Sequence, residues 1–139
     1  MKRGQDQQQT QQMLREILED ARHAPLQRFR QLVLAFVRSE CEEAGMRVAL
    51  NDAAPLYRDA PEAQQARVEG ERIIERFLRE ALPDVAAPAR QLAGDLVTTT
   101  LSAVGKQFSE SPRSEDEIQR YAQAMGDMFC AYLQGLPRG

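Results

Sequence analysis

The chain has 139 residues, of which 42% are hydrophobic and 28% are charged, and its formal net charge is −3. These proportions are typical of one globular domain and exclude a wholly disordered chain. The longest uninterrupted apolar run, Leu32 to Val37, is far shorter than the stretch of about 20 residues that a membrane span needs. Lysine and arginine form no long run, so this chain alone is not expected to bind nucleic acid.

Histidine and cysteine are scarce. Cys41 and Cys130 lie far apart in the sequence, and we interpret them as small buried hydrophobic residues, with a disulfide between them as the alternative. The single histidine, His23, is predicted to be a solvated or helix-capping residue. Because there is no second histidine and no closely spaced pair of cysteines, neither a metal site nor a cofactor is expected.

The usual catalytic motifs are missing from the sequence, which has no glycine-rich phosphate loop and no Gly-x-Ser-x-Gly motif. Cys41 has no nearby histidine that would act as its base. Most carboxylates fall on polar helical faces, where solvent exposure is the default. An enzyme is therefore not predicted. The start of the chain also lacks an apolar signal sequence, which favours a cytoplasmic location.

The amino-terminal residues are rich in glutamine. Residues 1–12 are expected to be a frayed or disordered start, followed by a single domain over 13–135. From Met13 an apolar stripe at helical spacing predicts a helix to about Ala21. Pro25 is well suited to the first position of the next helix.

The second helix is expected over residues 25–44, with Gly45 as its C-cap. Its middle turns are apolar nearly all round, which is typical of a central helix packed on more than one side. Residues 46–60 are predicted to form a short helix, from Met46 to Asn51, followed by a turn.

Two capping boxes mark later helices, because an N-cap residue is followed three positions on by a glutamate. Asp59 and Glu62 open a helix that ends at Pro83. Ser114 and Glu117 open the last helix, over residues 115–134.

The helix between these two is expected over about residues 85–108, with Asp84 as its cap. Its small, uncharged positions Thr98, Thr99, Ser102 and Gly105 are assigned to the outward face. No segment alternates polar and apolar residues with period two over a useful length. The predicted fold class is therefore all-α, an antiparallel bundle of about five to six helices.

Two single residues stand out against this pattern. Glu40 lies at the edge of the apolar stripe of the second helix, and it forms either an ion pair with Arg72 or Arg47 or a polar contact in a ligand cavity. Gly70 interrupts an apolar stripe at a cost of about 1 kcal/mol relative to alanine. It indicates either close helix packing or a cavity.

The last two helices combine long apolar stripes with small residues and few charges. Each has more than one face that is apolar or small, so one face can serve the core of the chain and another a partner. We predict self-association through these helices, with a buried central position in a monomer as the alternative.

Four stretches point to a known family: Asn51 to Glu62, Ile73 to Leu78, Leu96 to Gly105, and Met128 to Leu133. Together they resemble the C-terminal regulatory domain of TetR-family transcription regulators, over about Met13 to Leu133. The resemblance implies an effector-binding domain whose last two helices form a four-helix bundle in a homodimer. It also implies that residues 5–22 correspond to a helix linking this domain to a DNA-binding domain, and that effector binding releases operator DNA.

No helix-turn-helix signature is present in this sequence, so the resemblance implies operator binding only through a domain outside it. The chain is then either a fragment of a longer repressor or a natural gene product that lacks the DNA-binding domain. The alternative function is a free-standing helical homodimer that acts as an adaptor or a dominant-negative partner. An adaptor is expected to have a close-packed core, whereas a sensor needs a cavity on the order of a few hundred Å³.

On this resemblance, apolar positions of the central helices become candidates for the wall of a site for a small apolar or cationic effector. These are Phe29, Val33, Phe36, Val37, Leu56, Val68, Phe77 and Val97, with Glu40, Tyr57 and Thr100 as polar anchors. The expected dimer interface comprises Leu92, Leu96, Thr99, Ala103, Ile118, Ala122, Met125, Phe129 and Tyr132. No membrane partner is expected.

Overall fold

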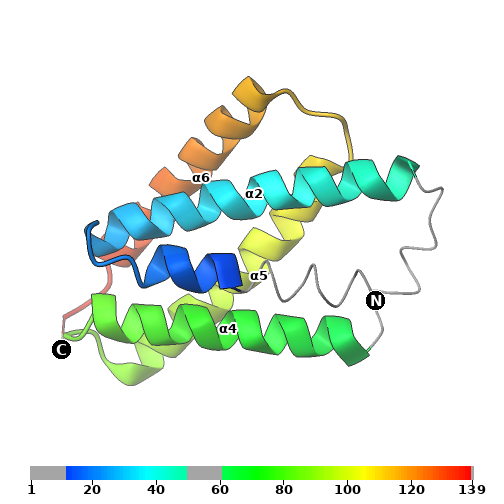
Figure 1. Cartoon of the computed structure of the whole chain (residues 1–139). Helices are drawn as coiled ribbons and strands as arrows, with labels where there is room; N and C mark the ends of the chain where they lie inside the picture. Colours follow the sequence, from blue (N-terminus) through cyan, green and yellow to red (C-terminus); the bar gives the residue numbers. More distant parts are fainter. Residues whose placement is uncertain (1–11, 50–60, 139) are drawn as a thin grey trace.

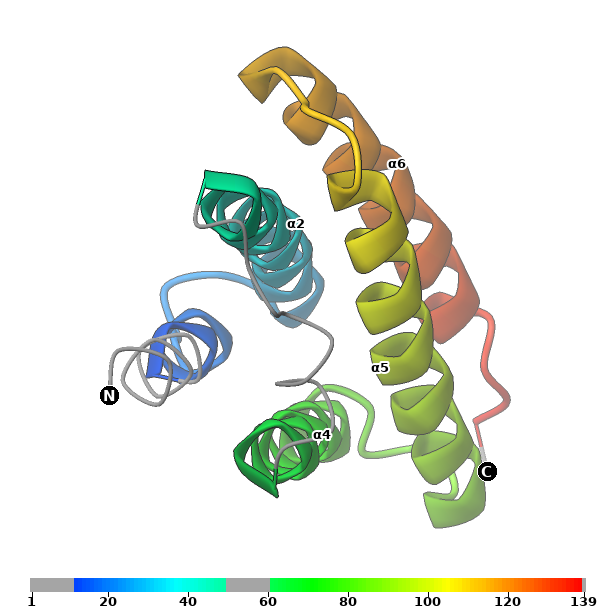
Figure 2. The ribbon, with the colours of Figure 1, turned by 90° about the vertical axis from the view of Figure 1, so that its right-hand side faces the viewer.

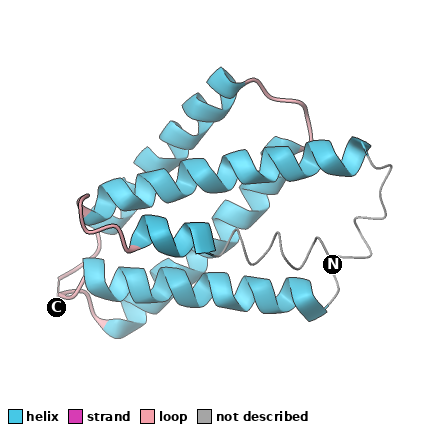
Figure 3. Cartoon of the chain, viewed as in Figure 1, coloured by secondary structure: helices cyan, strands magenta, loops and turns pink. Residues whose placement is uncertain are grey.

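Helices make up the regular structure of the chain. The computed structural model describes residues 12–49 and 61–138, and over these residues the only other regular feature is an isolated antiparallel bridge between Val85 and Arg138 (Figure 3). The all-α fold class is confirmed. Within the same residues no helix is long and apolar enough to cross a membrane.

A short helical segment precedes the longer helices (Figure 1). It covers residues 12–18 and is called the 12–18 segment below. The longer helices are α2 (Pro25–Ala49), α4 (Pro61–Ala81), α5 (Ala87–Ser109) and α6 (Glu115–Gln134). The 12–18 segment and α4 run in the same direction, and α2 runs opposite to both.

The helices lie in two layers. The 12–18 segment, α2 and α4 form the first layer, and α5 and α6 form the second (Figure 2). α2 contacts both helices of the second layer, and α4 contacts α5. The side of α5 and α6 that faces away from the first layer carries no other described helix.

The core lies between these layers and centres on Phe29 of α2, which is fully buried. Its ring stacks on Phe77 of α4 with 6.0 Å between centroids, and it meets Phe129 of α6 edge-on at 5.8 Å. Stacked and edge-on pairs of this kind are favourable beyond the apolar area that they bury. One side chain therefore joins helices from both layers.

The first helix ends at Leu18, earlier than the predicted Ala21. The carboxylate of Asp20 accepts a hydrogen bond from the backbone N–H two residues on, which favours a turn over a helix. The Arg28 guanidinium of α2 donates to the backbone carbonyl oxygens of Leu18 and His23. Local polar contacts therefore fix the corner between the 12–18 segment and α2.

α2 continues through Gly45 to Ala49, so the predicted helix end at residue 44 was wrong. A Cβ added to Gly45 would have no described atom within 4 Å, and the glycine is exposed. An exposed glycine weakens a helix by about 1 kcal/mol but does not by itself end it. Residues 50–60, which include the predicted Asp59 cap, lie outside the described residues.

α5 begins at Ala87 rather than at residue 85, and Asp84 is not its N-cap. The actual N-cap position makes no side-chain hydrogen bond, and Pro88 occupies the first turn. Val85 pairs instead with Arg138 near the end of the chain. This pairing directly precedes the extended N-cap residue Ala86, so the helix begins only at Ala87.

Small residues form the inner face of α5. Thr98 and Gly105 are buried, so their predicted outward position was wrong. A Cβ added to Gly94 would stand 3.6 Å from Leu78 of α4, and one added to Gly105 would stand 3.1 Å from Phe36 of α2. Because α5 packs against both α2 and α4, Gly105 must be small to allow close approach to Phe36, whereas the distance at Gly94 is an ordinary van der Waals contact.

The capping box of α6 is confirmed. The backbone N–H of Glu117 donates to the Ser114 hydroxyl, and the backbone N–H of Ser114 donates to the Glu117 carboxylate. Two of the N–H groups that the helix start leaves unpaired are thereby satisfied.

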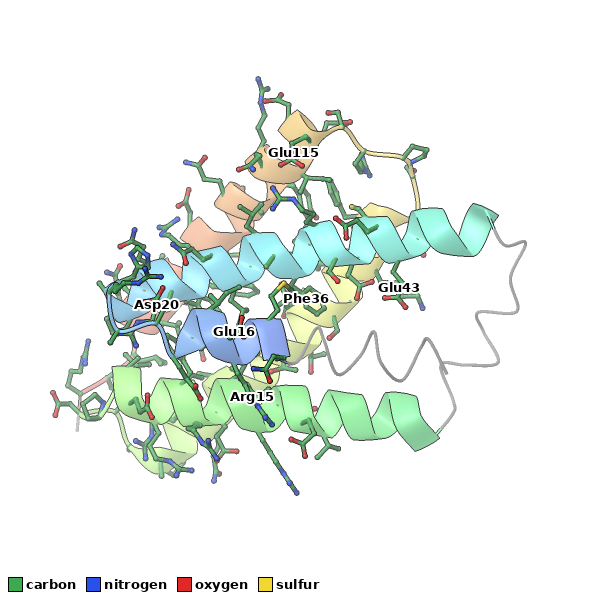
Figure 4. The ribbon with its side chains drawn as sticks, viewed as in Figure 1. Arg15, Glu16, Asp20, Phe36, Glu43 and Glu115 are labelled. Carbon is green, nitrogen blue, oxygen red and sulfur yellow. The ribbon has the colours of Figure 1, made fainter. Side chains whose placement is uncertain are left out.

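Two ion pairs connect α2 with α6. Arg30 pairs with Asp127, and Arg38 pairs with Glu115 at the start of α6 (Figure 4). The Arg38 guanidinium lowers the pKa of the Glu115 carboxyl. Because both pairs are exposed to solvent, they contribute to the register of the two helices more than to the strength of their packing.

Gly70 of α4 has open space beside it, because an added Cβ would have no described atom within 4 Å. We therefore expect Gly70→Ala to raise the free energy of unfolding by about 0.5–1 kcal/mol, since alanine has the higher helix propensity. Urea denaturation at a fixed protein concentration measures this. Gly105→Ala should raise the free energy of unfolding by less, because its Cβ would stand 3.1 Å from the Phe36 ring. Equal gains in the two variants, or a loss in Gly70→Ala, would contradict the packing described.

Candidate functional site

The second layer exposes large apolar side chains that the core does not use. Of the five large hydrophobic residues exposed in the described part of the chain, four lie on α5 and α6. Leu92 and Leu96 of α5 are 64% and 47% exposed, and Tyr121 and Met128 of α6 are 38% and 53% exposed. A gathering of this kind on one face indicates an interaction site.

These side chains form regular stripes along both helices, named here the α5–α6 stripe. It consists of Leu92, Leu96, Thr99 and Ala103 on α5 and of Tyr121, Ala124, Met128 and Ala131 on α6, all of them exposed. Intervals of three and four residues alternate on both helices. This spacing keeps a seam on one side of a helix and is that of packed helical bundles. The buried positions of α5, such as Val97 and Leu101, fall on the opposite side of that helix.

Aromatic and cationic contacts hold the connection between α5 and α6. The ring of Phe108 stacks on that of Tyr121 with 4.0 Å between centroids. The Arg113 guanidinium lies 4.2 Å from the centre of the Phe108 ring and donates to the Phe108 carbonyl oxygen. These contacts fix the relative position of the two helices at the end where they are joined.

A second feature is a groove between the 12–18 segment and α4, with a volume of about 150 Å³. A cavity of about that volume holds a benzene-sized molecule. Three apolar side chains line its floor: Leu18, Ile73 and Phe77. Six charged side chains form its rim: Arg15, Glu19, Glu69, Arg72, Arg76 and Glu80.

One end of the groove is bridged by an ion pair. Arg15 reaches from the 12–18 segment toward α4 (Figure 4), and its guanidinium lies 3.4 Å from the Glu69 carboxylate. Arg72 lies 3.5 Å from the other oxygen of the same carboxylate. Glu69 therefore connects the 12–18 segment to α4.

A family model described as tetracyclin repressor-like, C-terminal domain, matches residues 24–136. The chain belongs to this family. The match covers all of α2 to α6, including both helices of the α5–α6 stripe. Domains of the family are regulatory. No curated protein gives a significant match to the chain.

The TetR-like domain distributes the predicted effector residues over several environments. Phe77 lines the groove. Phe29, Val33, Val37 and Val97 are fully buried in the core, Phe36, Glu40 and Thr100 are half-buried, and Val68 is exposed. Leu56 and Tyr57 lie outside the described residues. The groove thus brings together one predicted residue and a charged rim that sequence reasoning missed, because charges four residues apart on a helix are typical of a solvated face.

The polar candidates also lie differently from their sequence interpretation. The side chain of Glu40 lies against α5, with its Cγ 3.5 Å from the position of an added Cβ on Gly105. Arg72 pairs with Glu69, and the Arg47 side chain lies outside the described residues. The threonine hydroxyl that is buried without a hydrogen-bond partner among the described residues is that of Thr98, not Thr100.

The predicted interface residues divide between the two faces of the second layer. The four on α5 belong to the α5–α6 stripe. On α6, Ile118, Ala122, Met125 and Phe129 are buried in the core of the chain itself, and Tyr132 is half-buried. Tyr121 and Met128 were missed, although their spacing defines a second stripe. Spacing alone does not show which of two apolar stripes faces inward.

Cys41 and Cys130 are free thiols. Cys130 is buried, as the sequence predicted, whereas Cys41 is half-buried. Burial raises the pKa of both thiols, which disfavours the nucleophilic thiolate form. Over the described residues, no three His, Cys, Asp or Glu side chains are grouped to hold a metal ion.

The capping box that starts α6 predicts a pH dependence. Hydrogen bonds from Ser114 lower the pKa of the Glu117 carboxyl, the backbone N–H making the larger contribution. A carboxyl whose pKa is lower in the folded state stabilises the fold above its unfolded pKa of about 4.3, and this contribution is lost as the pH falls through the folded value. The urea midpoint of Glu117→Gln should therefore lie furthest below that of the wild type above about pH 5, and the difference should shrink in acid.

The matched control for this measurement is Glu110→Gln. This change removes an exposed carboxylate that makes no side-chain hydrogen bond with the described residues. A difference between wild type and Glu117→Gln that stays constant from about pH 6 to 3, or an equal profile in the control, would count against the capping contribution.

Proposed function

We propose that this chain is the effector-binding and dimerisation domain of a TetR-type transcriptional repressor. Effector binding shifts the balance between two dimer geometries and so controls DNA binding by a helix-turn-helix domain that is not in this sequence. Family membership supports the regulatory class. The single observation that carries the proposal is the α5–α6 stripe.

Three properties of the stripe favour a second copy of the same chain as its partner. Its exposed residues are apolar or small and uncharged on both helices. Their alternating spacing of three and four suits the packing of helix against helix. Two helices from each of two copies, related by a two-fold axis, close into a four-helix bundle and leave no unpaired surface.

The groove supports the effector-binding part of the proposal. It lies between α4 and the 12–18 segment, and the resemblance to TetR-family regulators places that segment in the helix leading to the DNA-binding domain. A molecule in the groove contacts both elements, so its affinity depends on their separation. Such differential affinity is what a ligand needs to shift a conformational equilibrium.

A second candidate function is a helical homodimer that acts as an adaptor without an effector. The observation that favours it is the close packing around Phe29, Val33, Val37 and Val97, each of which is completely buried. This is the packing expected of a static core. Both functions use the α5–α6 stripe, and they differ in whether the groove binds a ligand.

Leu96→Glu tests the dimer. We expect the wild-type chain to have twice the mass of one chain in light scattering and Leu96→Glu to have the mass of one chain, because a glutamate in the seam would be buried without a partner. The matched control is Val68→Glu on α4. Val68 is 45% exposed and Leu96 is 47% exposed, but Val68 lies outside the stripe. The control should remain a dimer, and a monomeric wild type would overturn the dimer assignment.

A further inference from the structure

Charge changes sign along the groove. On α4, Arg72, Arg76 and Glu80 follow one another at intervals of four residues, so neighbouring members lie about 6 Å apart along the helix axis. Arg15 and Glu19 have the same interval on the other side of the groove. Because the 12–18 segment and α4 run in the same direction (Figure 1), Arg15 and Arg72, which share Glu69, lie toward one end of the groove, and Glu19 and Glu80 lie further along their elements.

The two ends of the groove also differ in how many of their charged side chains form ion pairs within the described residues. Glu69 is shared by two arginines, as described above. The side chains of Arg76, Glu19 and Glu80 have no hydrogen-bond or ion-pair partner among the described residues. A guanidinium and two carboxylates without a partner among the described residues therefore border the same groove. Of these, Arg76 and Glu80 are one helical turn apart on α4.

An apolar floor lies between these charges. Leu18 and Phe77 are almost completely buried, and Ile73 is half-buried. The whole groove has a volume of about 150 Å³, which is room for one aromatic ring or a branched aliphatic chain against this floor. A molecule that fits has an apolar body and, at one end, two groups of opposite charge.

We propose that the groove binds a small zwitterion with an apolar body, the chemistry of an α-amino acid with an aromatic or large aliphatic side chain. The ligand carboxylate pairs with the Arg76 guanidinium, its ammonium group pairs with Glu80 and Glu19, and its apolar body lies on Ile73 and Phe77. This inference rests on the proposed function, because it names the class of effector. It differs from the small apolar or cationic effector expected from the sequence.

Charge complementarity is what separates the zwitterion from its relatives. An anion satisfies Arg76 but brings negative charge close to Glu19 and Glu80. A cation satisfies the carboxylates but meets Arg76. A neutral apolar molecule gains only the contact with the floor and leaves all three charges unmatched.

Isothermal titration calorimetry of the whole chain with four compounds of one shape tests the proposal. L-Phenylalanine carries both charges, N-acetyl-L-phenylalanine only the carboxylate, L-phenylalaninamide only the ammonium, and 3-phenylpropanamide neither. We expect L-phenylalanine to bind most tightly, with an affinity about tenfold higher than that of each singly charged compound. This factor corresponds to the loss of one charge-assisted contact. Equal affinities, a preference for another compound, or no binding of any of the four would overturn the proposal.

Two substitutions assign the charges. Arg76→Gln should weaken the binding of L-phenylalanine and N-acetyl-L-phenylalanine about tenfold and leave that of L-phenylalaninamide unchanged. Glu80→Gln should instead weaken the binding of L-phenylalaninamide and leave that of N-acetyl-L-phenylalanine unchanged. The matched control is Arg79→Gln, because Arg79 pairs with Glu75 and does not line the groove. The control should bind as the wild type does. Thermal melts of each variant show that it is folded, and equal effects of all three substitutions would overturn the assignment.

The light-scattering result keeps this inference separate from the proposed function. A monomeric wild type that still prefers the zwitterion would overturn the repressor dimer and retain the ligand class. A dimer without that preference would overturn the ligand class and leave the effector-binding and dimerisation function standing. Titration of Leu96→Glu shows directly whether the groove depends on dimerisation.

Discussion

The contact of Phe29 with Phe77 and Phe129 is the interaction that holds the two layers in one core. Phe29 is fully buried on α2, and its two partners come from α4 in the first layer and from α6 in the second. Any movement of α2 relative to α4 therefore also changes its packing against α6. The two exposed ion pairs between α2 and α6 add register to this arrangement, and apolar packing supplies most of its strength.

α5 is the element that this core leaves apolar on two sides. Its inner face packs on Leu78 of α4 at Gly94 and needs a small residue at Gly105, where Phe36 of α2 approaches closely. Its outer face keeps Leu92 among its exposed side chains, although no described helix covers it. A helix with two apolar faces lowers the solubility of a protein unless other protein surfaces cover both faces. The outer face is therefore best explained by a partner, and the alternating spacing on α5 and α6 matches a second copy of the same pair.

Apolar periodicity and capping chemistry were enough to predict the helical class, the order of the helices and the exact start of α6. Predicted boundaries failed where side chains or distant backbone intervene. Asp20 and Arg28 end the first helix early, and the pairing of Val85 with Arg138 delays α5. Neither contact leaves a periodic signal, because the partners are a local turn and a residue at the far end of the chain. The rim of the groove was missed for a similar reason, since only the three-dimensional position of Arg76 distinguishes it from a solvated arginine.

Phe77 belongs both to the groove and to the core. It contributes to the groove floor, and it stacks on Phe29, which in turn contacts Phe129 of α6. A ligand that presses on the Phe77 ring therefore acts on a continuous series of packed side chains that ends on a helix of the α5–α6 stripe. Packed aromatic rings respond to displacement by moving together, because the core has little free volume. The same three rings that hold the layers together thus form a continuous packed route from the groove to α6 of the α5–α6 stripe. A ligand in the groove acts along this route only if it favours one of two arrangements of the rings.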